Sequence, residues 1–297
     1  MSNRSYIKTE QSWTMKSQIE SRAEQQETRG NQQGFVDKQK VMAKQQKTHV
    51  LQTVRSMNPD ALVFPSENGM APKKTEQFLR GKTVLFDMDG TLLDTFEPIL
   101  ISMRYATKKV LGRVIPDSVL VEGVGQPLVD QMVALADEPN QSDALLKVYR
   151  VHNEQNLYEN SKPFAGVAEM VAEVKALGAK VGVVTSKRHS IASGSLSYYG
   201  LLDQFDCFVG LEDSTEHKPN PEPLFVAANM LNVNISSCIY VGDSPYDMQA
   251  AQAAGIPHIA VTWGKFFSRE ILEAEHPQKL IDSPNELVKA LYEILLK

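Results

Sequence analysis

Two carboxylates that lie one residue apart, Asp87 and Asp89, follow the apolar run 84–86 and precede Gly90 and Thr91. The apolar run is typical of a buried strand, and Asp-Gly is typical of the turn that ends it. Successive strand side chains point to opposite faces, so the two carboxylates share a face only where the strand continues. Otherwise one residue offers its carboxylate and the other its backbone carbonyl. Either set of oxygens suits Mg²⁺ together with a phosphate, whereas a plain strand and turn leaves Asp87 and Thr91 without a role.

A second polar cluster, Thr185 and Ser186, ends the apolar run 181–184. Hydroxyls and free backbone amides at the start of a helix form a cradle for phosphate, because the first N–H groups of a helix have no partner within it. The alternative is that one of the two hydroxyls only caps the helix that follows. For either residue alone, the capping role is the simpler interpretation.

Lys218 precedes a stretch that three prolines stiffen, at positions 219, 221 and 223. Proline fixes its own backbone and favours the first turn of a helix. Lys218 is therefore held just before a helix, where its ammonium could meet a phosphate oxygen or an attacking carboxylate. The alternative is a surface lysine beside a rigid turn.

The last cluster repeats the pattern of the first, since the apolar run 239–241 ends in Gly242 and Asp243, and Asp247 follows. Asp247 could cap a helix and Asp243 could end a turn, without either taking part in chemistry. However, four polar clusters of this kind, each placed after an apolar run, are hard to explain as four independent turns and caps. We therefore predict that they form one site.

These clusters require elements that bring them together. We expect strands at 83–87, 180–185, 206–210, 238–242 and 257–262. Helical patterns occupy 166–177, 188–199, 221–232, 245–254 and 284–296. This alternation predicts an α/β fold, a Rossmann-like parallel sheet flanked by helices, in which ligands bind at the carboxyl ends of the strands.

One interval has helices without strands. Helical patterns occur near 97–111, 126–136 and 141–158, directly after the first strand. We therefore predict a helical cap at 97–162, inserted into a catalytic core formed by 81–96 and 163–297. A cap that leaves the core at the strand ends would cover the site.

Residues 1–80 differ in composition from the remainder. They are rich in glutamine and carry 13 Lys and Arg against 8 Asp and Glu, whereas the remainder carries 18 against 28. We expect a disordered or loosely helical basic extension. The acidic remainder argues against nucleic acid as a partner.

Cellular placement follows from what the sequence lacks. The chain has two cysteines, Cys207 and Cys238, both in apolar runs, so we expect buried free thiols rather than a disulfide framework. It has neither a run of about 18 apolar residues nor an apolar secretory signal. We expect a cytoplasmic protein without membrane contact, as a monomer or homodimer.

The four clusters in this order resemble the haloacid dehalogenase superfamily, the subtype with a small helical cap. The match rests on 87–91, on Thr185 with Ser186, on Lys218 with Pro219, and on 242–243 with Asp247. The stretches 216–223 and 261–264 resemble the phosphoglycolate phosphatase and PpaX-type pyrophosphatase branch. The resemblance covers residues 81–297.

The resemblance implies an aspartyl-phosphate mechanism. It makes Asp87 the nucleophile, and it makes Asp89 the general acid that protonates the leaving oxygen and later the base for water. It also implies Mg²⁺, bound by Asp87, by the backbone carbonyl of Asp89 and by Asp243, with Asp247 in support.

The same resemblance implies which residues bind the phosphoryl group, and it implies that the cap determines which substrate is accepted. Thr185, Ser186 and Lys218 would hold the phosphoryl oxygens, with Thr185 and Lys218 also counted as catalytic. Ordinary helix surface is the alternative for each cap residue. The candidates that would face the substrate are Arg104, Gln126, Tyr149 and His152.

We therefore expect a Mg²⁺-dependent phosphohydrolase that acts on a small phosphate monoester, such as phosphoglycolate, or on pyrophosphate. A phosphomutase of the β-phosphoglucomutase kind is one alternative, in which the phosphoryl group passes to a sugar instead of water. Formation of an isomer from glucose 1-phosphate, as opposed to phosphate release, separates the two. An interaction protein that acts through residues 1–80 is the other alternative.

Overall fold

A parallel six-stranded sheet forms the centre of the computed structural model, which describes residues 77–296. The strand order is β5-β4-β1-β6-β7-β8, and every neighbouring pair is parallel. The predicted α/β fold is thereby confirmed. The strands are β1 (Thr83–Phe86), β4 (Lys180–Val184), β5 (Cys207–Val209), β6 (Cys238–Gly242), β7 (His258–Val261) and β8 (Lys279–Ile281).

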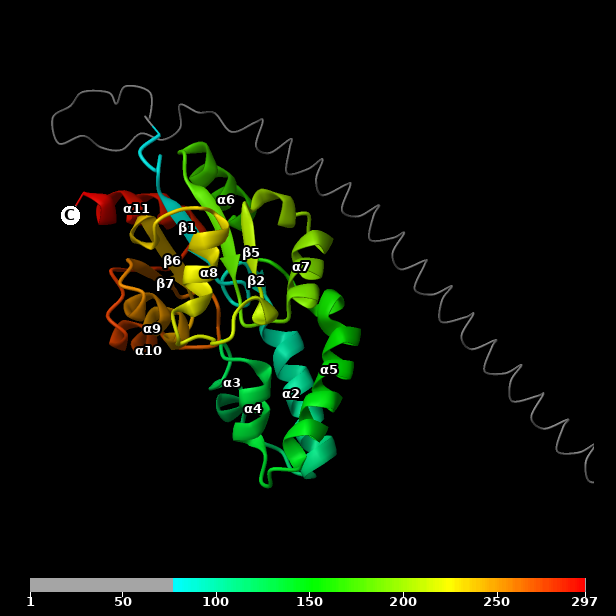
Figure 1. Ribbon diagram of the computed structural model, residues 1–297. Helices are drawn as coiled ribbons and strands as arrows, with labels where there is room; N and C mark the ends of the chain where they lie inside the picture. Colours follow the sequence, from blue (N-terminus) through cyan, green and yellow to red (C-terminus); the bar gives the residue numbers. More distant parts are fainter. Residues whose placement is uncertain (1–76, 297) are drawn as a thin grey trace, which may run out of the picture. The chain divides into compact units, whose positions relative to one another are not determined.

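Helices cover both faces of this sheet (Figure 1). One face packs on α6 (Val167–Ala176), α7 (His189–Tyr198) and α11 (Leu287–Leu295). The other packs on α8 (Glu222–Met230) and α9 (Pro245–Ala253). Strands buried on both faces read as continuous apolar runs rather than as alternating ones, which is why the runs were visible in the sequence.

The central strand is β1, which pairs with β4 on one side and β6 on the other. The chain first builds the sheet from β1 to β4 and β5, and then returns to add β6, β7 and β8. The direction of growth reverses beside β1, and such a switch point leaves a crevice at the carboxyl ends of the strands. Three of the four predicted clusters lie directly after the three central strands.

A helical insertion follows β1. It begins and ends at a short antiparallel pair, in which Leu93 faces Pro163 and Asp94 faces Lys162. Its helices share an apolar cluster, which Phe266 from the segment after β7 also joins. The separation into cap and core at 97–162 stays a prediction. The elements are β2 (Leu93–Asp94), α2 (Phe96–Leu111), α3 (Asp117–Val121), α4 (Leu128–Leu135), α5 (Gln141–Asn160) and β3 (Lys162–Pro163).

Several short elements lacked a recognisable sequence pattern. These are α3, α10 (Arg269–Ala274), β8 and four 3-10 turns, η1 (Leu202–Gln204), η2 (Leu211–Asp213), η3 (Ile235–Ser237) and η4 (Pro284–Glu286). Five or six residues are too few for a helical period to show, and β8 has only three residues at the sheet edge. The prediction for 1–80 lies outside the described residues, except for 77–80.

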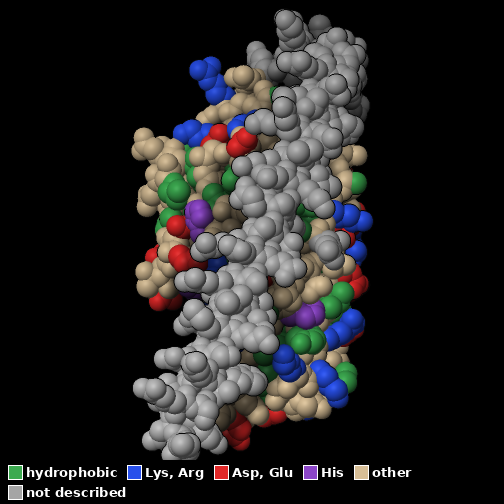
Figure 2. All heavy atoms as spheres, turned by 90° about the vertical axis from the view of Figure 1, so that its right-hand side faces the viewer, with side chains coloured by type: hydrophobic (Ala, Val, Ile, Leu, Met, Phe, Trp, Pro, Cys, Tyr) green, Lys and Arg blue, Asp and Glu red, His purple; other side chains and the backbone are tan. Residues whose placement is uncertain are grey.

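Cys207 and Cys238 are buried and free, as expected. No helix among residues 77–296 is long and apolar enough to cross a bilayer. Figure 2 shows basic and acidic side chains together on the described part of one face.

Candidate active site

Lys218 lies at the centre of a buried group of oxygens. Its Nζ donates to Asp87 Oδ1 over 2.8 Å and to Asp247 Oδ1 over 2.6 Å. It also reaches the hydroxyl of Tyr240 at 3.2 Å. The Lys218 side chain is only 1% exposed, so it is not the surface lysine of the alternative interpretation. One cation thus holds three residues, one directly after β1, one in β6 and one in α9.

Asp247 performs two tasks with its two carboxylate oxygens. Oδ2 accepts from the backbone N–H and the hydroxyl of Ser244, at 3.1 and 2.6 Å, and so closes the capping box of α9. Oδ1 accepts from Lys218 and from Tyr240. The capping role and a place in the site are therefore both present in one side chain.

Asp243 has an unsatisfied oxygen. Its Oδ1 accepts from the Thr91 hydroxyl at 3.3 Å, while its buried Oδ2 has no hydrogen-bond partner among residues 77–296. A Cβ atom on Gly90 or on Gly264 would collide with this carboxylate. Gly90 also has φ +81°, a conformation that favours glycine. The two glycines keep space open around an acceptor that lacks a donor.

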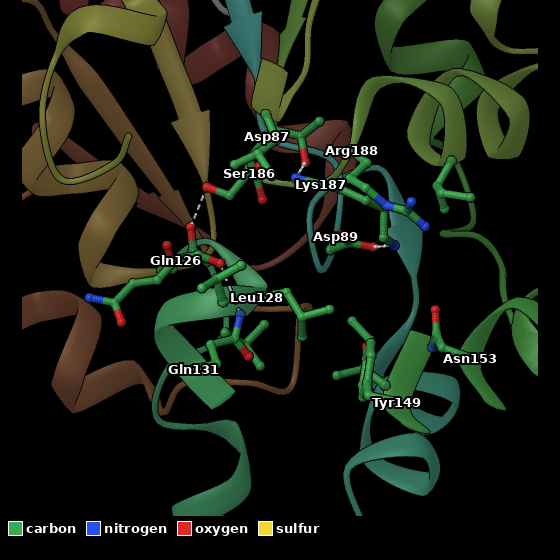
Figure 3. Close-up of a pocket in the computed structure, with 18 of the residues that line it drawn as sticks. Asp87, Asp89, Gln126, Leu128, Gln131, Tyr149, Asn153, Ser186, Lys187 and Arg188 are labelled. Atoms are coloured by element: carbon green, nitrogen blue, oxygen red, sulfur yellow. Dashed lines mark hydrogen bonds and ion pairs between the residues drawn. The ribbon is translucent and has the colours of Figure 1, made fainter. Parts of the chain in front are cut away.

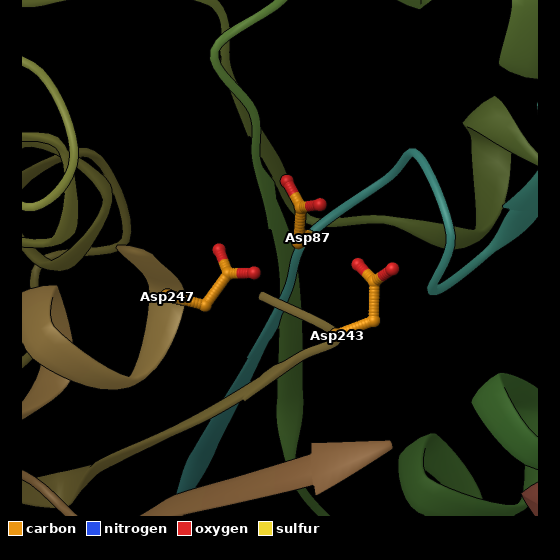
Figure 4. Close-up of side chains that lie close together, drawn as sticks. All are labelled: Asp87, Asp243 and Asp247. Atoms are coloured by element: carbon orange, nitrogen blue, oxygen red, sulfur yellow. The ribbon is translucent and has the colours of Figure 1, made fainter. Parts of the chain in front are cut away.

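The carboxylates of Asp87, Asp243 and Asp247 converge. Each offers one oxygen such that the three lie within 4.8 Å of one another. Figure 4 shows the three side chains close together. Buried carboxylates without enough donors are costly unless a cation joins them. Oxygen-only donors suit a hard divalent cation such as Mg²⁺. The unpartnered Oδ2 of Asp243 and the space beside it therefore fit a metal ion.

The pKa shifts in this group show that ionised carboxylates are unfavourable here without a metal. Burial raises the pKa of Asp87 to about 7, although Lys218 opposes the shift. Burial, with the neighbouring Asp87 and Asp247, raises the pKa of Asp243 well above its ordinary value. Burial acts to lower the pKa of Lys218, but Asp247 and Asp87 outweigh burial and the pKa is raised. Lys218 therefore stays charged.

Asp89 is set apart from these carboxylates. Its Oδ1 accepts from Lys187 Nζ at 2.7 Å, and both side chains are about 15% exposed, at 15% and 14%. Figure 3 shows this pair at the cavity, beside Asp87. Asp87 and Asp89 thus differ in environment: the first carboxylate is buried with Lys218, and the second meets the cavity and Lys187.

Thr185 and Ser186 lie after β4, next to β1. Neither caps α7, because Thr185 Oγ1 accepts from the N–H of Lys187 at 3.2 Å and Ser186 Oγ donates to the carbonyl of Gly125 at 2.6 Å. The simple capping interpretation is therefore wrong for both residues. Ser186 instead links the core to the bend before α4.

These groups surround a cavity of about 90 Å³ between the sheet and the helical insertion. In Figure 3, Gln126, Leu128 and Gln131 approach it from one side and Tyr149 and Asn153 from α5. The lining from the core includes Asp87, Asp89, Thr185, Ser186, Lys187 and Asp243. Lys218 and Asp247 are not part of the lining and lie behind Asp87.

The four candidates from the insertion divide in two. Gln126 and Tyr149 line the cavity, whereas Arg104 and His152 do not. Arg104 donates to Asp117 Oδ1 at 2.8 Å on the exposed surface, and the ring of His152 stacks on Tyr105. The expectation that Arg104 faces the site does not fit this geometry, because its side of α2 is turned away.

Sequence patterns did not indicate the roles of three lining residues. Lys187 was visible only as a neighbour of Ser186, and nothing marked its pairing with Asp89. Arg150 and Asn153 lie on α5, whose helical pattern gives no rotation relative to the core. Tyr149 was the available signal for Asn153, which lies four residues further along α5 and therefore on the same face. It gave no signal for Arg150, because adjacent residues on a helix point in different directions.

The sequence of this chain is similar to those of known proteins. The family model of haloacid dehalogenase-like hydrolases matches residues 84–261. A protein of Caldanaerobacter subterraneus subsp. tengcongensis, described as "putative pyrophosphatase PpaX", is 36% identical over 208 residues, which are 70% of this chain and 93% of that protein.

Two solved structures have similar folds. A predicted phosphatase from Clostridium acetobutylicum superposes with a TM-score of 0.65 at 28% identity and covers 72% of this chain and 99% of its own. A predicted phosphoglycolate phosphatase from Haemophilus somnus has the same TM-score at 23% identity, over 72% and 97% of the two chains. The second likeness concerns the fold alone.

Proposed function

The chain belongs to the haloacid dehalogenase-like hydrolase family and is a phosphatase of that family, and from this premise we propose that it hydrolyses pyrophosphate or a small phosphate monoester with Mg²⁺. The observation that supports this most is the convergence of Asp87, Asp243 and Asp247 on one another. Lys218 binds Asp87 and Asp247, and Asp89 is kept apart. The PpaX name of the 36% identical relative favours pyrophosphate, and a phosphoglycolate-like ester is the other substrate.

In the first step, Asp87 would attack phosphorus through a carboxylate oxygen. A new P–O bond forms while the bond to the leaving oxygen breaks. Lys218, which holds Asp87 Oδ1, keeps that side chain in one orientation. Asp89 would donate a proton to the leaving oxygen, which suits its place at the cavity.

In the second step, water would release the phosphate. Asp89, now a carboxylate, takes a proton from the water, whose oxygen attacks phosphorus and frees Asp87. Lys187 lies within hydrogen-bond distance of Asp89 and would keep it oriented between the two steps. The net result is one water consumed, with release of two phosphates from pyrophosphate, or of one phosphate and one alcohol from a monoester.

The remaining groups would hold the phosphoryl oxygens and balance their charge. Thr185 and the amides near Ser186 lie at the cavity after β4 and can donate to those oxygens. When bound by Asp87, Asp243 and the backbone of Asp89, with Asp247 in support, Mg²⁺ would lessen the repulsion between nucleophile and phosphate. Ser244 and Tyr240 orient Asp247 through hydrogen bonds.

The test measures phosphate release from pyrophosphate and from 2-phosphoglycolate, with Mg²⁺ and with EDTA, for the wild type and for Asp87→Asn. We expect release from at least one substrate, dependent on Mg²⁺ and lost in the variant. Rapid acid quench with substrate labelled at phosphorus should trap labelled protein in the wild type only. Near-normal turnover by a folded Asp87→Asn protein would show that Asp87 is not the nucleophile.

Asp89→Asn serves as the matched variant, since it also removes one carboxylate from the cavity. A leaving group that needs no proton, such as p-nitrophenolate, should still depart, so labelled protein should accumulate because the water step lacks its base. An Asp89→Asn variant that is as unlabelled as Asp87→Asn would contradict the separation of the two roles.

A further inference from the structure

The cavity wall contributed by α5 carries a cation whose partner is absent from residues 77–296. Arg150 lines the cavity, and its buried Nε has no hydrogen-bond partner. The other two cations of the lining are engaged, Lys187 with Asp89 at 2.7 Å and Arg188 with Glu154 at 2.5 Å. Among the described residues, Arg150 is thus the lining cation left for a ligand.

Within the described part of the chain, three lining residues hold a buried side-chain atom without a partner, and the three atoms differ in chemistry. Asp243 Oδ2 and Gln131 Oε1 are acceptors, while Arg150 Nε is a donor on a permanent positive charge. Asp243 lies among the carboxylates that fit a metal. An unsatisfied buried donor is costly, so an acceptor delivered by a ligand would relieve Arg150.

From these observations we propose that Arg150 determines specificity by binding a second oxyanion, a carboxylate or phosphate, on the leaving group of the substrate. The inference rests on the proposed function, which puts the reacting phosphoryl group beside Asp87 and Thr185 in the core. Arg150 belongs to α5 in the helical insertion, so it meets the other end of a bound molecule.

The lining of the cavity favours an anionic partner for Arg150. The apolar wall lowers the effective dielectric around the guanidinium, which strengthens its attraction to an anion. Guanidinium also matches carboxylate and phosphate oxygens in a two-pronged geometry that a hydroxyl does not offer. The apolar lining residues are Ile99, Val124, Leu128, Val129, Ile191, Leu211 and Phe267.

The experiment compares kcat/KM for pyrophosphate and for 2-phosphoglycolate with that for phenyl phosphate, whose leaving group carries no second anion until it departs. In Arg150→Ala both ratios should fall by roughly tenfold or more, mainly through KM, because a charged hydrogen bond is lost. Arg150→Lys should recover part of the loss. A larger fall for pyrophosphate indicates a phosphate partner, and a larger fall for phosphoglycolate indicates a carboxylate.

Lys147→Ala is the control, because Lys147 lies on the same helix, is exposed and does not line the cavity. This variant removes the same net charge and should change the ratios by less than about twofold. Ratios in Arg150→Ala that match those of Lys147→Ala would overturn the proposal.

A binding measurement tests the role of Arg150 independently of catalysis. Calorimetry with Mg²⁺ would compare methylenediphosphonate with methylphosphonate in Asp87→Asn and in Asp87→Asn/Arg150→Ala. The preference for the bisphosphonate should fall by roughly tenfold in the double variant, and an unchanged preference rejects the role of Arg150. Absence of phosphate release from the wild type would instead count against the proposed function.

Discussion

Lys187 and Asp89 form an ion pair of 2.7 Å across 98 residues of sequence, between the end of β4 and the turn after β1. The pair stands at the cavity, whereas Asp87 is paired with Lys218 behind it. Asp87 and Asp89, which lie one residue apart in the chain, are therefore paired with two different lysines. This division lets one act on phosphorus and the other on protons.

Replacing Lys187 by methionine should lower kcat about 10- to 100-fold, because Asp89 loses the charged hydrogen bond that orients it. Lys187→Arg should retain part of the activity. Steady-state kinetics with the better of the two proposed substrates measures this, and circular dichroism checks the fold.

A double-mutant cycle separates this role from direct substrate binding. If Lys187 acts through Asp89, Lys187→Met should cost little more in the Asp89→Asn background. Equal losses in both backgrounds would mean that Lys187 works independently of Asp89.

Lys218→Met should lower the free energy of unfolding by about 3–5 kcal/mol, because it leaves buried carboxylates without their cation. Urea unfolding in EDTA measures the change. Lys175→Ala is the control, since the Lys175–Asp206 pair is about one third exposed, at 34% and 35%, and its loss should cost no more than about 1 kcal/mol. Equal destabilisation by both variants would show that burial of Lys218 has no special consequence.

The parts of the site that lie along one strand were predictable, and the parts that need two distant segments were not. The runs before Asp87, Thr185 and Asp243 are buried on both sheet faces, so their apolar composition marked the strands and their ends. Nothing local to Gly264 indicates that it packs on Asp243.

The longer helices of the insertion were predictable from the sequence, but their orientation on the core was not. Arg104 and Arg150 both lie in predicted helices, and a helical pattern does not say which neighbour covers a given face of the helix. Arg104 meets Asp117 outside the cavity, and Arg150 lines it. Choosing between them required the packing of α2 and α5 on the core.

Gly264→Ala should weaken Mg²⁺ binding while leaving most of the fold intact. Its Cβ would collide with the Asp243 carboxylate and the carbonyl of Gly90, so the carboxylate must turn from its present position. We expect the Mg²⁺ affinity, measured by calorimetry, to fall by roughly tenfold or more.

Gly194→Ala is the matched control, because Gly194 lies within α7 and a Cβ there would meet only the tip of a tyrosine side chain at 3.3 Å. Alanine favours a helix over glycine by about 0.5–1 kcal/mol, so this variant should be as stable as the wild type and should bind Mg²⁺ normally. Equal affinity in both variants would remove the reason given for glycine at 264.

The pH dependence of stability should reveal the strained carboxylates. The pKa of Asp87 is raised by burial from 3.8 to about 7, so the folded state holds this proton more tightly than the unfolded state. The stabilising contribution is complete below pH 3.8 and is lost as the pH rises through about 7. Bound Mg²⁺ would supply the positive charge that is lost when Asp87 releases its proton. The metal and the proton therefore compete for the same carboxylate oxygens.

Saturating Mg²⁺ should therefore raise the melting temperature more at pH 8 than at pH 5.5, relative to EDTA at each pH. A binding free energy of a few kcal/mol at the higher pH corresponds to roughly 5 °C or more for a chain of this size. In Asp87→Asn, both the loss of stability with rising pH in EDTA and the gain from Mg²⁺ should shrink, because the titrating carboxylate is gone. A Mg²⁺ shift that is equal at both pH values, or larger at pH 5.5, would show that the metal does not compete with protons for Asp87.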